Sequence, residues 1–157
     1  MKEIVIPGLY LMAGICAYAA VVHLGAGVRR LFDSVQITFA GTTALMLPFT
    51  FFLARGLAAT DVGDYVQSLK WSLAVAFFTL ALFAWFISFY TARRPQPSLL
   101  TLTSVFATLA AVNFVQPYSL QYAEIHGLAG MRLPWGETIT VAQGRSITGA
   151  MPELSLS

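Results

Sequence analysis

Four long stretches of this chain contain no Asp, Glu, Lys or Arg, and they limit its fold more than any other feature. The stretches are residues 4–28, 34–54, 71–92 and 95–123. A helix of about 20 apolar residues is long enough to cross the roughly 30 Å hydrocarbon layer of a bilayer. Because lipid offers no hydrogen-bond partners, backbone of this length and composition satisfies itself as a helix. The sequence therefore predicts an all-α integral membrane protein with four transmembrane helices.

Cap and turn residues set the expected helix bounds. Thr60 or Asp61 offers an N-cap ahead of the third apolar stretch, with acidic residues in the first turn, so that helix is expected to begin near residue 62. Pro48 is expected to kink the second helix or to end its outer part. The predicted helices are about 4–28, 34–54, 62–92 and 98–117, within a transmembrane domain over residues 1–123.

The remaining segment, residues 118–157, differs in character from the rest of the chain. Leu133–Glu137 is rich in turn residues and Thr138–Val141 is rich in β-branched residues. Such a pattern indicates a short hairpin or strand. We expect it to lie on the extracytoplasmic surface, followed by a polar tail.

Composition agrees with a membrane protein and excludes other classes. Hydrophobic residues make up 57% of the chain and charged residues 10%, whereas roughly a quarter of residues are charged in soluble domains. The net charge of +2 is small and the basic residues are scattered, so a nucleic-acid partner is not expected. A single cysteine, Cys16, excludes an intramolecular disulfide or a thiolate cluster.

Two arginine pairs in short loops predict the orientation. Arg29–Arg30 and Arg93–Arg94 follow the first and third apolar stretches. The positive-inside rule places both pairs in the cytoplasm. With four crossings, both termini are then extracytoplasmic, in a bacterial inner membrane.

Small residues recur four apart inside two stretches. These are Ala13 and Ala17 in the first, and Ala107 and Ala111 in the fourth. Such pairs allow two helix backbones to approach closely, which is what drives helix association in lipid. They predict helix packing, in a compact bundle or against another protein.

His23 is the histidine expected within the membrane. An ionisable side chain there is a candidate for ligand binding or proton transfer. The simpler interpretation is a neutral imidazole near the inner surface that bonds to water or to a carbonyl. Haem ligation would require a second histidine at the same depth, and His126 is predicted to lie outside.

The other candidate residues lie toward the C-terminal end. Asn113 and Gln116, three apart on one helix, could line a small ligand cavity, although an interhelical hydrogen bond of roughly 1 kcal/mol is the favoured interpretation. Trp135 and Glu137 are candidates for ligand or partner contact, with solvated surface groups as the simpler alternative. No metal-ligand set or catalytic motif occurs, so neither an enzyme nor a cofactor is expected.

The stretches Val112–Pro117, Tyr122–Leu128 and Leu133–Gly144 carry a resemblance. They resemble the outer segment after the fourth helix in the N-terminal seven-helix membrane sensor region of bacterial PAS-containing histidine kinases and related cyclic-dinucleotide signalling proteins. The layout of the earlier helices is similar as well. This resemblance implies an input module that passes a signal to a cytoplasmic output domain. The remaining helices and the output domains are missing, so only the front four helices correspond.

Two functional hypotheses follow. The first is a non-enzymatic membrane protein, equivalent to a truncated sensory input module, that acts by helix contact with another membrane protein. The alternative is a small accessory subunit that docks onto a larger energy-converting or photosynthetic membrane complex. A third hypothesis, a transporter or a pigment-binding protein, has less support than these two, because few polar groups lie within the membrane stretches.

Overall fold

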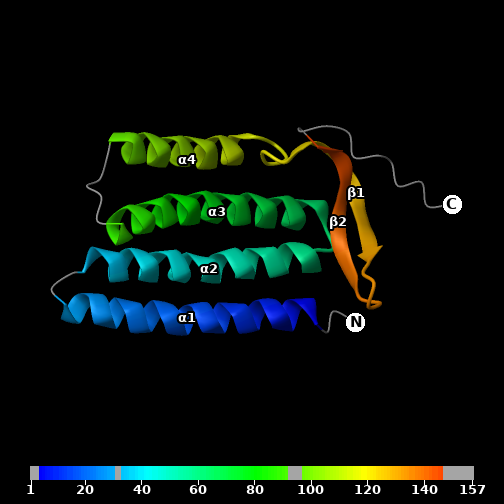
Figure 1. Cartoon of the computed structure of the whole chain (residues 1–157). Helices are drawn as coiled ribbons and strands as arrows, with labels where there is room; N and C mark the ends of the chain where they lie inside the picture. Colours follow the sequence, from blue (N-terminus) through cyan, green and yellow to red (C-terminus); the bar gives the residue numbers. More distant parts are fainter. Residues whose placement is uncertain (1–3, 31–32, 92–96, 147–157) are drawn as a thin grey trace.

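Four long helices are followed by two strands in the computed structural model, which describes residues 4–30, 33–91 and 97–146 (Figure 1). Each helix is long and apolar enough to cross a membrane, which confirms the four predicted membrane-length helices. Arg93–Arg94 and the predicted polar tail beyond residue 146 lie outside the described residues. The elements are α1 (Val5–Arg29), α2 (Ser34–Ala58), α3 (Val62–Tyr90), α4 (Pro97–Val115), β1 (Tyr122–Arg132) and β2 (Thr138–Ser146).

The helix ends differ from the predicted ends by a few residues. α2 runs on to Ala58 and ends only where Ala59 turns to an extended conformation, because a single arginine, Arg55, is a good helix former and does not break the helix. It also continues through Pro48, so the expectation that Pro48 could end it is wrong. α4 ends at Val115 rather than at residue 117. The Gln116 amide still donates to the Val112 carbonyl, but Pro117 has no N–H with which to continue.

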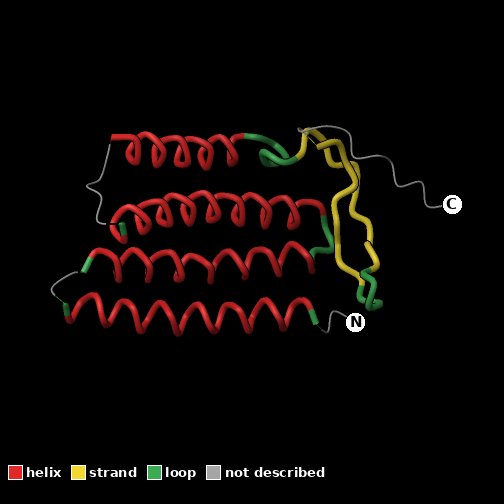
Figure 2. The backbone as a smooth tube through the Cα atoms, viewed as in Figure 1, coloured by secondary structure: helices red, strands yellow, loops and turns green. Residues whose placement is uncertain are grey.

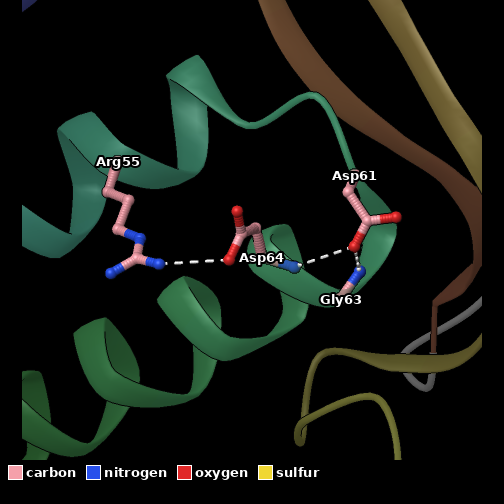
Figure 3. Close-up of polar contacts among 4 residues, drawn as sticks. All are labelled: Arg55, Asp61, Gly63 and Asp64. Atoms are coloured by element: carbon pink, nitrogen blue, oxygen red, sulfur yellow. Dashed lines mark hydrogen bonds and ion pairs between the residues drawn. The ribbon is translucent and has the colours of Figure 1, made fainter.

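The start of α3 is as predicted. Asp61 is the N-cap residue, and its carboxylate accepts from the Gly63 amide at 2.7 Å and from the Asp64 amide at 3.4 Å (Figure 3). The Asp64 carboxylate pairs with the Arg55 guanidinium at 3.1 Å, which links the last turn of α2 to the first turn of α3. Both side chains of this ion pair are more than half exposed, so its contribution to stability is small.

The helices stand side by side in chain order, from α1 to α4 (Figures 1 and 2). Extensive contacts join α1 with α2, α2 with α3, and α3 with α4, and no comparable contact joins α1 with α4 among the described residues. The prediction that the helices pack together is confirmed. The expected helix bundle is thus supported, and within it the four helices are arranged as an open row.

Small residues set the spacing within the row. A Cβ atom added at Gly27 of α1 would lie 3.0 Å from Ile37 Cγ1 of α2, and one added at Gly56 of α2 would lie 3.5 Å from Ser68 Cβ of α3. Close approach of backbones at such positions is typical of helices that pack in lipid. The buried side chains of α2 and α3 are mostly small, namely Ala40, Thr50, Ala54, Ser68, Ser72, Ala74, Val75 and Ala81.

β1 and β2 form an antiparallel hairpin that lies across one end of the row (Figure 1). We call this end, which also holds the start of α1 and the α2–α3 loop, the hairpin end. The strands have 11 and 9 residues, so the predicted hairpin is confirmed but is longer than the short one expected. The fold is therefore mostly helical with a small sheet, and the all-α assignment is wrong in that respect.

The turn of the hairpin follows directly from its sequence. The Gly136 amide donates to the Leu133 carbonyl at 2.8 Å, and the Leu133 amide donates to the Glu137 carbonyl at 2.7 Å. Pro134 fits the second position of such a turn, and Gly136 has φ +89°, a conformation that favours glycine. This turn fixes the position of Glu137 relative to the helices.

Candidate functional site

Glu137 lies at the hairpin end and is buried, with its carboxylate over the first turn of α1. Both carboxylate oxygens accept from the Val5 amide, at 3.4 and 3.3 Å, across 132 positions of sequence. α1 has no side-chain cap of its own at Ile4 and no acidic residue in its first turn. The first amides of a helix lack partners within it, and its N-terminus favours negative charge. Glu137 therefore caps α1 from the far end of the chain.

Trp135 lies beside this contact. Its Nε1 donates to Glu137 Oε2 at 3.1 Å, while 58% of the residue stays exposed. The two residues singled out in the C-terminal segment thus belong to one cluster. The expectation that they are solvated surface groups is wrong for Glu137, which is 5% exposed because it caps α1.

The strands are also fastened to the middle of the row. Thr140 Oγ1 donates to the Ala59 carbonyl, in the α2–α3 loop, at 3.1 Å. The Tyr65 hydroxyl, in the first turn of α3, interacts with the Tyr122 hydroxyl at the start of β1 and with the backbone of Ala142 in β2. Two further helices are in this way connected to the hairpin.

Asn113 forms the connection to α4. Its side chain is completely buried, and its Nδ2 donates to the Lys70 carbonyl of α3 at 2.8 Å. Its Oδ1 accepts from Ser119 Oγ at 2.5 Å and from the Leu120 amide at 3.2 Å. Ser119 is buried and has φ 71°, so the amide of Asn113 holds a left-handed turn in place. The bond from Asn113 to Lys70 is the interhelical hydrogen bond that was the favoured interpretation of this residue.

Gln116, the other member of the predicted polar pair, is exposed. Its backbone amide continues the helix, and its side chain does not join that of Asn113 in a shared buried site. Because the polar atoms of the Asn113 amide already have partners, a ligand-binding role for this pair loses its support. Asn113 has a structural role, because its hydrogen bonds connect α4 to α3 and to the segment that leads into the hairpin.

These contacts make the hairpin a brace across the row. Glu137 holds α1, Thr140 holds the end of α2, and Tyr122 lies against α3, while the segment leading into β1 is held by Asn113 of α4. An open row lacks the contact between first and last helices that closes a bundle. The hairpin supplies that connection at one end.

His23 lies at the opposite part of the row, between α1 and α2. Its Nδ1 is 2.5 Å from Gln36 Oε1, which requires the proton on Nδ1, and its ring meets the Phe39 ring edge-on at 4.4 Å between centroids. The imidazole thus bonds to a carbonyl oxygen, as the simpler interpretation expected, and that oxygen belongs to the Gln36 side chain of the neighbouring helix. This pair is an interhelical polar contact.

The predicted small-residue pairs occupy different environments. Ala13 and Ala17 are half-buried on α1, whereas Ala107 and Ala111 are exposed on α4. α4 turns another side toward α3, where Ala110 is buried and Thr103 Oγ1 accepts from Trp85 Nε1 at 2.9 Å. Ala107 and Ala111 therefore do not pack against the described part of this chain, and their contact with another chain stays a prediction.

No group of three or more potential metal ligands gathers anywhere in the part of the chain that the structure describes. His126 and Glu124 approach to 3.7 Å, with both side chains mostly exposed. Two exposed groups do not form a metal site.

Sequence reasoning missed the partner of His23 and several residues of the brace. Gln36 could have been found, because an amide in an apolar stretch requires a partner. Tyr65, Ser119 and Thr140 gave no such signal, because their roles depend on contacts between distant segments.

Comparison with known protein families, with curated proteins and with solved structures found no match for this chain. The resemblance to sensor regions therefore stays a prediction, and the function rests on the geometry described above.

Proposed function

We propose that this chain is a non-enzymatic membrane module that acts by helix contact with a second membrane protein, as the front four helices of a sensory input region would. In this proposal it resides in a bacterial inner membrane, with the hairpin end and both termini extracytoplasmic. The arginine pair Arg29–Arg30, at the opposite end of α1, supports this orientation.

A stripe of small residues on α4 is the observation that carries the proposal. Ser104, Ala107, Thr108 and Ala111 recur at helical spacing, and all four are exposed on a side of α4 turned away from α3. The hydroxyls of Ser104 and Thr108 donate to carbonyls of their own helix, at 2.9 and 2.8 Å. The stripe is therefore smooth and lets another backbone approach closely. α4 is the last helix of the row, so nothing in the described chain covers this side.

The open row supports the same conclusion. α1, at the other edge, has only two buried residues, Ala20 and Gly27, and exposes large apolar side chains such as Tyr18 and Val21. Lipid can cover such a surface. It can equally accept helices of another protein, because association in lipid depends on packing rather than on hydrophobic burial.

The test is purification in mild detergent, with quantification of what accompanies the chain. We expect a membrane protein in fixed stoichiometry, which is lost when Ala107 or Ala111 is changed to Leu. Val105→Leu is the matched control, because Val105 is exposed on another side of α4. A chain that purifies alone, or a partner retained equally by all three variants, would contradict the proposal.

The identity of the partner separates the two hypotheses. A protein carrying further helices with a PAS or kinase domain would favour the sensory role. A large energy-converting or photosynthetic complex would favour the alternative, an accessory subunit.

A further inference from the structure

The tip of the hairpin, residues 131–137, has its depth fixed by α1. α1 has 25 residues. At about 1.5 Å per residue it extends about 37 Å, or about 35 Å when tilted by about 20°, which exceeds the roughly 30 Å hydrocarbon layer. The first residue in the first turn of a centred α1, Val5, therefore lies about 2–3 Å beyond the hydrocarbon layer, at the level of the headgroups. The Glu137 carboxylate contacts the Val5 amide in that turn, so the tip lies at the same depth.

The exposed groups of the tip suit that layer. Trp135 is 58% exposed and Met131 is 46% exposed, whereas the indole N–H of Trp135 already has Glu137 as its acceptor. An indole with an apolar body and a satisfied polar edge favours the boundary between lipid and water. Arg132, also exposed, supplies a guanidinium that matches a phosphate group in charge and geometry.

We propose that the hairpin tip is a lipid-binding surface, in which the Trp135 indole lies in the headgroup layer and Arg132 binds lipid phosphate. Lipid is the occupant because the tip is held at headgroup depth by the helix beside it and carries a cation for phosphate. The proposal rests on the membrane placement of α1 in the proposed function and is independent of any protein partner. It gives the brace a second role, which is to fix the row against the bilayer surface.

Fluorescence of single-tryptophan variants tests this directly, because the chain has three tryptophans. Trp71→Phe with Trp85→Phe leaves Trp135 as the reporter. Trp85→Phe with Trp135→Phe leaves Trp71, which is exposed within the membrane-length part of α3 and is the matched control. Both variants are placed in phosphatidylcholine vesicles with bromine at shallow or deep acyl positions, and aqueous iodide is added separately.

We expect the Trp135 emission to be quenched more by shallow than by deep bromine and to be protected from iodide. Trp71, next to Lys70 at the edge of the third apolar stretch, is expected to be quenched by bromine as well, which reports insertion of α3. In the Trp135 reporter, Glu137→Ala should release the tip, with a gain in iodide quenching and a loss of bromine quenching. Glu124→Ala, at an exposed site on β1, should change neither.

Three outcomes would overturn the proposal. Iodide quenching of Trp135 without bromine quenching would place the tip in water, while bromine quenching of Trp71 still showed membrane insertion. Protection of Trp135 from both quenchers would mean that protein covers the tip. Absence of bromine quenching at both tryptophans would remove the membrane placement itself, and the proposed function with it.

Discussion

The Glu137 carboxylate accepts from the Val5 amide, and this contact joins the hairpin to the first helix across 132 positions of sequence. α1 contacts only its neighbour α2 extensively among the described helices, so it would otherwise be free at its start. The hairpin thus connects the two edges of an open row. Stability at this end depends on a few polar contacts rather than on a large apolar core.

Replacing Glu137 should lower stability. Glu137→Ala removes the acceptor for the first turn of α1 and leaves the Trp135 N–H unpaired, so we expect a loss of about 1–2 kcal/mol in the free energy of unfolding. Glu137→Gln keeps an acceptor oxygen and should lose less. SDS titration of the protein in mild detergent, followed by circular dichroism, measures the difference. Glu124→Ala, which removes an exposed carboxylate, is the control, and an equal loss there would contradict the capping role.

Asn113 should be the most sensitive polar residue of α4. Asn113→Ala would leave the Lys70 carbonyl, the Ser119 hydroxyl and the Leu120 amide without their partner, with an expected loss of about 1–3 kcal/mol. Asn113→Asp keeps the acceptor but removes the donor to Lys70. The same SDS titration serves as the measurement. Gln116→Ala should change the unfolding free energy by less than about 0.5 kcal/mol, because its side chain is exposed.

The four membrane-length helices could be predicted from the sequence because a long stretch without charged residues is a simple signal. Every charge-free stretch contains most or all of one long helix, and Asp61 is the N-cap of the third helix, as predicted. The hairpin turn could also be predicted from the sequence, because Pro134 and Gly136 each fit one position of the turn. These features depend on neighbouring residues alone.

The arrangement of the helices could not be predicted in the same way. Each helix is apolar on all sides, so no polar face shows which side packs. The predicted packing residues Ala107 and Ala111 are exposed, whereas Ala110 is buried. β1 was hidden because Gly127 and Gly130 weaken a strand signal. The role of Glu137 required knowing that the hairpin lies across α1, which is a property of the whole fold.

Glycine substitutions in α1 should reveal the close contact with α2. An added Cβ at Gly27 would lie 3.0 Å from Ile37 Cγ1 and 3.1 Å from Gln36 Cβ, whereas one at Gly25 meets nothing within 4 Å. We expect Gly27→Ala to be less stable than Gly25→Ala by about 1–2 kcal/mol, because both gain helix propensity and only one crowds its neighbour. Thermal unfolding in detergent compares the two. Equal stability would mean that the two helices are not in close contact there.

Cysteine labelling should show which side of the membrane the hairpin end faces. On a Cys16→Ala background, single cysteines are placed at Glu124 on the hairpin and at Arg30 beyond α1, both exposed and at opposite ends of the row. The positive-inside rule predicts that a membrane-impermeant thiol reagent labels the Glu124→Cys protein in intact spheroplasts and the Arg30→Cys protein only after lysis. The reverse pattern would keep the fold and invert the orientation. Labelling of both sites without lysis would mean that α1 does not cross the bilayer, because a helix of this length separates the two compartments only when it spans the membrane.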